Sequence, residues 1–227
     1  MFRFEKESHM PVPTDETAPG WAAAGRLPVD EQLVALEEAL SRNDTLVEVL
    51  DRAAELAAPD WYLTAGCLFQ TVWNVVTGRP PTHGIRDYDL FYFDPADLSW
   101  AAEDRVIQDA AALFADLPVS VEIRNEARVH LWYEEKFGVP CPPHTSVESA
   151  VDSFAATTCC LAVRQKHDGR WRFYAPHGLS DVFNLVLRPN PALAPEPVYR
   201  AKAERWQRLW PELTVLPWPA PTPGSTG

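Results

Sequence analysis

A short aromatic run with two aspartates is the feature that most constrains the fold of this chain. Residues 87–93 read Asp-Tyr-Asp-Leu-Phe-Tyr-Phe, and Asp94-Pro95 ends the run. Aromatic residues favour strands, so the run is predicted to be a buried strand. Side chains two residues apart in a strand point to the same face of the sheet. Asp87 and Asp89 are therefore predicted to hold two carboxylates close together on one face.

A glycine turn precedes this strand by about twenty residues. The apolar run 61–65 is strand-like, and residues 66–78 then carry apolar side chains in helical register between Gly66 and Gly78. A glycine before a helix lets backbone amides and the positive end of the helix dipole approach a phosphate. The alternative for Gly66 is a purely steric role, because any strand-to-helix turn can require glycine.

Two neighbouring carboxylates repel each other unless a cation neutralises them. Mg²⁺ prefers one or two carboxylates together with phosphate oxygens and water. The aspartate pair and the turn at Gly66 together predict a nucleoside triphosphate held on a metal ion. The alternative for Asp87 and Asp89 is a pair of solvated carboxylates on an edge strand.

A third carboxylate follows on the next predicted strand. Residues 119–124 read Val-Ser-Val-Glu-Ile-Arg and alternate between apolar and polar side chains. If this strand lies beside residues 87–93, Glu122 joins the aspartate pair, and three converging carboxylates are what a two-metal site needs. Otherwise Glu122 is an ordinary exposed strand residue. Arg128 follows the same strand and is suited to bidentate phosphate binding, or else it ties loops together.

Four longer strings resemble a known family. They are residues 66–74, 84–94, 121–132 and 176–183, and the resemblance extends over roughly residues 60–212. They look like bacterial nucleotidyltransferase family proteins of the DNA polymerase beta-like nucleotidyltransferase superfamily. The resemblance implies transfer of a nucleoside monophosphate from an NTP to a hydroxyl acceptor, with release of pyrophosphate and with Mg²⁺ or Mn²⁺ as cofactor.

The resemblance also implies roles for particular residues. Asp87, Asp89 and Glu122 would be the catalytic, metal-binding carboxylates, and Gly66 would be the glycine of the phosphate loop. The superfamily usually has Gly-Ser or Gly-Gly where this chain has Gly66-Cys67, so Cys67 is expected to contact a nucleotide through its backbone alone. This departure supports one alternative function, a non-catalytic nucleotide-binding or protein-interaction module. A metal-dependent phosphohydrolase is the other alternative.

The order of predicted elements indicates an α+β (α/β-like) fold with a mixed sheet. Residues 1–29 are predicted to form an N-terminal arm, 30–212 a single domain, and 213–227 a proline-rich flexible tail. Further elements are expected within the domain: helices at 33–40, 45–57, 97–117, 179–187 and 199–210, and a C-terminal hairpin within 157–175 that turns at Asp168-Gly169. Thr45 and Glu48 form a capping-box pattern at the start of the second helix.

Composition limits the partners and the compartment. The formal net charge is −12, with 20 Lys and Arg against 32 Asp and Glu, which disfavours a long nucleic-acid partner and favours a small-molecule or protein acceptor. The four cysteines lack paired metal-ligand spacing, and this favours reduced thiols and the cytoplasm. No run approaches the roughly 20 apolar residues of a membrane span, so no membrane partner is expected.

Overall fold

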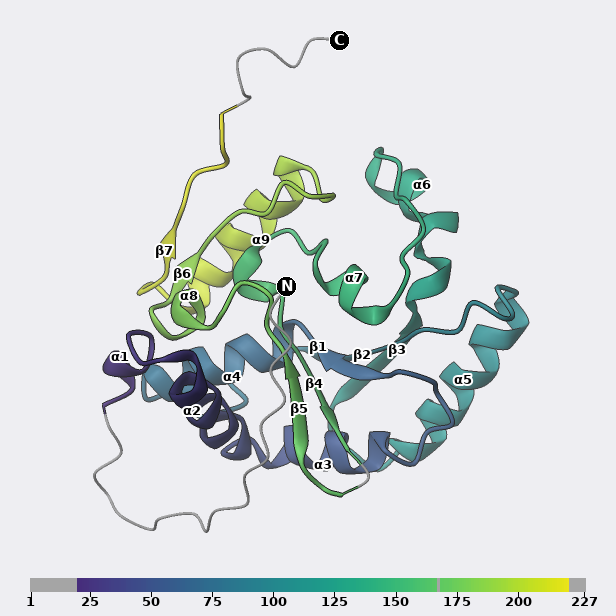
Figure 1. Ribbon diagram of the computed structural model, residues 1–227, viewed down its shortest axis with the longest axis horizontal. Helices are drawn as coiled ribbons and strands as arrows, with labels where there is room; N and C mark the ends of the chain where they lie inside the picture. Colours follow the sequence, from purple (N-terminus) through teal and green to yellow (C-terminus); the bar gives the residue numbers. More distant parts are fainter. Residues whose placement is uncertain (1–19, 167, 221–227) are drawn as a thin grey trace.

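The computed structural model describes residues 20–166 and 168–220, and within them a mixed five-stranded sheet forms the centre of the molecule (Figure 1). The strand order is β3-β2-β1-β4-β5. Strands β2 and β3 are parallel, and every other neighbouring pair is antiparallel. The strands are β1 Tyr62–Thr64, β2 Asp87–Tyr92, β3 Ser120–Asn125, β4 Ala162–Gln165 and β5 Trp171–Tyr174.

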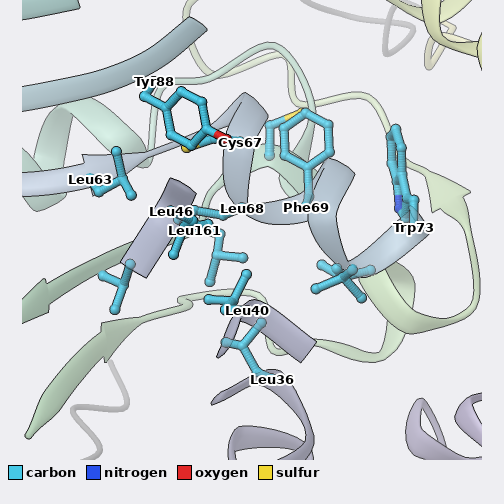
Figure 2. Close-up of a cluster of buried hydrophobic side chains, with 14 of the residues drawn as sticks. Leu36, Leu40, Leu46, Leu63, Cys67, Leu68, Phe69, Trp73, Tyr88 and Leu161 are labelled. Carbon is cyan, nitrogen blue, oxygen red and sulfur yellow. The ribbon is translucent and has the colours of Figure 1, made fainter. Parts of the chain in front are cut away.

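Helices cover one face of this sheet and build the main core with it. They are α2 Val29–Ser41, α3 Asp44–Ala53, α4 Gly66–Val76 and α5 Trp100–Leu113. Tyr88 and Leu90 of β2 point into this core, where they are 1% and 0% exposed. Figure 2 shows Tyr88 beside Cys67 and Leu68 at the start of α4, with leucines of α2 and α3 close by. The odd-numbered residues of β2 therefore face the other side of the sheet.

The second face is only partly covered. Helix α7, Val147–Val151, packs on Tyr62, Ala162 and the neighbouring Phe91. The register pairs Tyr62 with Phe91 and Thr64 with Asp89, so the helix covers the part of the face that adjoins the aspartates. In Figure 1, α6, α7 and α9 lie on the opposite side of the sheet from α3. The aspartates are left half-buried on this second face.

The remaining elements surround this framework. They are α1 Trp21–Ala24, the 3₁₀ helices η1 Glu126–Leu131 and η2 Thr157–Cys159, α6 Tyr133–Phe137, α8 Ser180–Phe183, β6 Val186–Leu187, α9 Glu196–Leu209 and β7 Thr214–Val215. Strands β6 and β7 form a separate parallel pair. None of the described helices is long and apolar enough to cross a membrane.

Most predicted elements are present, and two of them differ in ways that the structure explains. The N-cap of α3 is Asn43, two residues before the Thr45 of the capping pattern, because the Asn43 side chain accepts a hydrogen bond from the Leu46 amide at 3.1 Å. The predicted helix 179–187 ends at Phe183. The chain then turns at Leu185, which has φ 52°, and enters β6 because β7 offers it a pairing partner.

Some elements lie outside residues 30–212, the range predicted for the single domain. Helix α1 and the start of α2 fall in the expected N-terminal arm, and Ala24 is buried. Strand β7 falls in the expected tail, where the Tyr199 hydroxyl donates to the Leu216 carbonyl at 2.7 Å. These contacts extend the folded unit on both sides of residues 30–212. The rest of the predicted arm, residues 1–19, and of the tail, residues 221–227, lie outside the described residues.

Candidate functional site

The three predicted carboxylates share one face of the sheet. In the parallel register of β2 and β3, Asp89 lies opposite Glu122, and Asp87 lies opposite Ser120. Residues paired in this way point to the same side of a sheet. Strands β2 and β3 are therefore neighbours, as the role predicted for Glu122 requires. This pairing brings Glu122 beside the aspartate pair.

The surroundings of Asp89 disfavour its charged form. Burial raises its pKa to about 7, and the neighbouring charges of Asp87 and Glu122 contribute in the same direction. The positive charges of Lys202 and Arg124 oppose this rise without cancelling it. Crowded carboxylates of this kind are stabilised by a nearby cation.

The carboxylate oxygens of Asp87, Asp89 and Glu122 are suitable ligands for a hard divalent cation. Carboxylate oxygens are the protein ligands that Mg²⁺ prefers, and phosphate oxygens and water complete its octahedral shell. Among the described residues, no three Asp, Glu, His or Cys side chains form a ready-made coordination shell. Glu122 is turned toward Arg124, whose Nη2 lies 3.5 Å from its Oε2, and about half of its side chain is exposed.

The turn before α4 lies directly beside the aspartates. Thr64 pairs with Asp89, and its hydroxyl donates to the Asp89 carbonyl at 3.3 Å. Ala65 then adopts φ 56° and ψ −122°, a backbone conformation that is costly for a residue with a Cβ. Among the described residues, nothing accepts a hydrogen bond from the amides of Gly66 and Cys67. This strained turn therefore presents two unused donors at a helix N-terminus.

Cys67 turns its side chain away from this site. The side chain is fully buried in the main core, where Figure 2 shows it beside Tyr88. Its thiol donates to the Thr64 carbonyl at 3.5 Å. Burial raises its pKa well above the usual value, and the negative charges of Asp89 and Asp87 add to the effect. Cys67 can thus offer a ligand only its backbone amide.

Gln70 is a neighbour of the turn that the sequence analysis did not single out. A Cβ placed on Gly66 would lie 2.9 Å from Gln70 Nε2, so the glycine makes room for this side chain. Gln70 is 5% exposed, and its Oε1 has no hydrogen-bond partner in the described part of the chain. A buried amide oxygen without a partner is unusual in a folded protein.

A comparison with protein families shows to which family this chain belongs. A family described as nucleotidyltransferase matches residues 51–215, which is well over half of the chain. The chain belongs to the nucleotidyltransferase family. The matched segment includes the turn at Gly66, both aspartates and Glu122.

A solved structure has the same fold as this nucleotidyltransferase family member. It is an NMR structure described as revealing a CCA-adding enzyme head domain. The TM-score is 0.66 at 22% sequence identity, over 80% of this chain and 96% of that chain. No curated protein matches the chain.

Arg128 is held by partners other than Asp87, Asp89 and Glu122. Its guanidinium forms a buried ion pair with Glu103 of α5, and its Nε donates to the Leu98 carbonyl at 2.9 Å. The Trp100 ring lies 5.5 Å from the guanidinium carbon. Arg128 thus connects η1 to α5 and the residues just before it. This corresponds to the second interpretation given for Arg128 above, in which it ties loops together.

Glu126 is a second residue of this family member that the sequence analysis did not select. It begins η1 directly after β3 and is 4% exposed. Burial raises its pKa to about 8, the negative charge of Asp89 adds to the rise, and Arg124 opposes it. Only the tertiary structure shows that this carboxyl is buried and that the charge of Asp89 acts on it, because the sequence pattern carries no burial signal at the end of a strand.

Proposed function

We propose that this protein binds a nucleoside triphosphate with Mg²⁺ or Mn²⁺ and transfers the nucleoside monophosphate to a hydroxyl acceptor, releasing pyrophosphate. The observation that carries the proposal is the register that sets Asp89 beside Glu122, next to the unused amides of Gly66 and Cys67. Membership of the nucleotidyltransferase family supports the same chemistry.

Each residue has a defined task in this proposal. Asp87 and Asp89 bind the cation, and Glu122 completes the ligand set after leaving Arg124. The amides of Gly66 and Cys67 donate to phosphate oxygens at the N-terminus of α4. When bound, the metal lowers the pKa of the acceptor hydroxyl and neutralises charge on the departing pyrophosphate. Arg128 has no task here, because its guanidinium is committed to Glu103.

The acceptor that we propose is a small molecule or a protein side chain. The net charge of −12 disfavours contact with a long nucleic acid through non-specific attraction. We also propose a cytoplasmic location, supported by four buried cysteines that are all free thiols.

The test is calorimetric titration of the four ribonucleoside triphosphates in Mg²⁺ and in chelator. We expect the wild type to bind at least one of them in a Mg²⁺-dependent manner. The Asp87→Asn/Asp89→Asn variant should lose at least a hundredfold in affinity, because its amides keep their shape but lack the charge that holds the cation. Asp109→Asn is the matched control, since Asp109 is exposed on α5, away from the site.

Measuring nucleotide turnover on the same samples distinguishes the proposed transferase from a phosphohydrolase and from a non-catalytic module. Equal binding by wild type and double variant would show that the site is assigned wrongly. Release of inorganic phosphate or nucleoside monophosphate without labelling of any acceptor would indicate a phosphohydrolase. Metal-dependent binding with no turnover of α-labelled nucleotide, across candidate hydroxyl acceptors, would indicate a non-catalytic nucleotide-binding module.

A further inference from the structure

Three exposed apolar side chains lie where the two parallel strands end. They are Leu98, Trp100 and Leu131, which are 36%, 59% and 56% exposed. The other large hydrophobic side chains that are exposed in the described part of the chain are Val29 and Val34, both of α2. Leu98 and Trp100 follow β2, and Leu131 ends η1, which follows β3. All three thus belong to segments that leave the same edge of the sheet, because β2 and β3 are parallel.

Asn125 ties these two segments to each other. It directly precedes η1, and its Nδ2 donates to the Asp94 carbonyl at 2.9 Å. Its Oδ1 accepts from the Asp94 amide at 3.1 Å. The loop after β2 is therefore bonded to the start of η1, so the residues that follow on each side remain neighbours.

Arg128 then brings the three apolar side chains together. Its Nε donates to the Leu98 carbonyl at 2.9 Å, and its Cζ lies 5.5 Å from the centre of the Trp100 ring. Leu131 follows Arg128 by three residues, and side chains at this spacing lie on the same face of a 3₁₀ helix. Leu98, Trp100 and Leu131 therefore form one surface around Arg128, the Trp100 patch.

The Trp100 ring is held in place although much of it is exposed. Arg128, against which it packs, forms a buried ion pair with Glu103. A side chain that is already ordered loses little conformational entropy when a partner covers it. Tryptophan is also enriched among the residues that contribute most to binding at protein interfaces. The patch thus has the properties of an anchor for a protein partner.

Acidic side chains predominate around the Trp100 patch. Asp97 directly precedes Leu98 and is exposed, and Asp104 lies one helical turn after Trp100, on the same face of α5. The charged side chains that are not buried in residues 94–105 and 131–136 are Asp94, Asp97, Asp104, Glu134 and Glu135 against Arg105 and Lys136. A positively charged partner complements this surface, whereas a nucleic acid or an anionic membrane is repelled by it.

We propose that the Trp100 patch binds a basic amphipathic segment of a partner protein. Apolar side chains of that segment cover Leu98, Trp100 and Leu131, and its Lys or Arg side chains lie near Asp97 and Asp104. The proposal goes beyond the proposed function, because it assigns a protein-binding surface outside the carboxylates and the turn at Gly66. Burial of the apolar side chains supplies affinity, and the acidic surroundings select the charge of the partner.

The experiment titrates fluorescently labelled peptides with the full-length protein and measures anisotropy. The probe is an amphipathic peptide of leucine and lysine, about 18 residues long, so that a helix of five turns has one apolar and one basic face. We expect it to bind about tenfold more tightly, or better, than two peptides of the same length. One of these, of leucine and glutamate, has the apolar face alone, and the other, of glutamine and lysine, has the positive charge alone.

Apolar variants of the chain test where the peptide binds. Trp100→Ser/Leu131→Ser should weaken binding of the leucine–lysine peptide about tenfold or more. The matched control is Val29→Ser/Val34→Ser, which removes two exposed apolar side chains from α2 and should bind as the wild type does. Equal affinities for the two folded variants would show that the inference is wrong.

Charge variants test the chemistry of the partner. Asp97→Asn/Asp104→Asn should weaken binding of the leucine–lysine peptide about threefold. The control is Glu55→Gln/Asp109→Asn, which removes the same charge from two exposed positions away from the patch. If the control weakens binding as much, or if the leucine–glutamate peptide binds as tightly as the leucine–lysine peptide, the patch does not select a basic partner and the inference is overturned.

A conservative variant separates binding from folding. Trp100→Phe/Leu131→Met keeps apolar side chains at both positions and should retain most of the affinity that Trp100→Ser/Leu131→Ser loses. Urea unfolding establishes that each variant is folded. Sedimentation of the unliganded protein tests a second occupant: a wild-type dimer that Trp100→Ser/Leu131→Ser converts to a monomer would show that another copy of this chain covers the patch, against the inference.

Failure of this inference is distinguishable from failure of the proposed function. Trp100→Ser/Leu131→Ser keeps Asp87, Asp89 and Glu122, so it should lose the peptide and still bind Mg²⁺-NTP as the wild type does. Unchanged peptide binding in that variant would overturn the inference and leave the nucleotide site untouched.

Discussion

Glu126 is a carboxyl group that the fold buries without giving it an ion pair among the described residues. It is 4% exposed, and its pKa rises from 4.5 to about 8, mainly because burial disfavours the charged form. Between these two values the folded protein holds a proton that the unfolded chain has already lost. The free energy of unfolding must therefore fall as pH rises from about 4.5 to about 8, and it stops responding to this group above that range.

We predict that Glu126→Gln removes this pH dependence. Glutamine has nearly the same shape as the protonated acid, so wild type and variant should be equally stable near pH 5. Above pH 8 the variant should be the more stable, by about 1.4 kcal/mol for each unit that separates the folded and unfolded pKa values. Urea unfolding at both pH values measures the difference, and Glu134→Gln, exposed on α6, is the control. Parallel pH profiles for wild type and variant would contradict the prediction.

At the scale of elements, the junction of η1 with α5 depends on one buried ion pair. Arg128 and Glu103 are both largely buried, and Glu103 also accepts a hydrogen bond from the Asn125 amide at 2.9 Å. The pair thus joins the end of β3 to the helix that packs beneath it. Removing one partner leaves the other charge buried and uncompensated, which is far more costly than removing both.

We predict that Arg128→Met lowers the free energy of unfolding by about 3–5 kcal/mol. The double variant Arg128→Met/Glu103→Gln should recover most of this loss, because the glutamine is neutral and its oxygen still accepts from the Asn125 amide. Urea unfolding of the single and double variants provides the measurement. A loss of nucleotide affinity at unchanged stability would instead give Arg128 a ligand role.

At the scale of the whole molecule, one asparagine joins three distant segments. Asn74 Oδ1 accepts from Trp210 Nε1 at 2.8 Å, and Asn74 Nδ2 donates to the carbonyls of Pro81 and His83 at 2.9 and 2.8 Å. Gly84 has φ 73°, and a Cβ there would lie 2.8 Å from the Trp210 ring. The C-terminal segment is therefore part of the structure that holds the loop leading to β2.

We predict that Trp210→Phe lowers the free energy of unfolding by about 1–3 kcal/mol, because it leaves Asn74 Oδ1 buried without its donor. Trp100→Phe is the control, since Trp100 is 59% exposed and phenylalanine keeps an aromatic ring beside the Arg128 guanidinium. Thermal unfolding of both variants measures the effect. Equal midpoints for the two would show that the contact with Asn74 contributes nothing to stability.

Features of the site that depend on neighbouring residues in the chain could be predicted from sequence. Strand periodicity placed Asp87 and Asp89 on one face, and the structure has them there, with Tyr88 buried on the other. The turn at Gly66 and the hairpin at Asp168-Gly169 were predicted in the same way and are present. Such features depend on neighbouring residues, whose conformational preferences act over a few positions.

Predictions from sequence were wrong or incomplete where a residue contacts a segment far away in the chain. The helix predicted for residues 179–187 is interrupted because Val186 and Leu187 pair with β7. The helix predicted for residues 199–210 is present as α9, but its periodicity did not show that the Trp206 ring packs on Phe69 and Trp73 of α4.

The sequence by itself determined the carboxylate pair, the glycine turn and the faces of the strands, because these follow from spacing along a short piece of chain. Only the tertiary structure decided which partners those residues have. Parallel pairing of β2 with β3 put Glu122 beside Asp89, and the ion pair with Glu103 of α5 holds the Arg128 side chain. The Trp206 ring of α9 packs on Phe69 of α4. These contacts join residues far apart in the chain, and their free energy comes from burial and charge in the folded state.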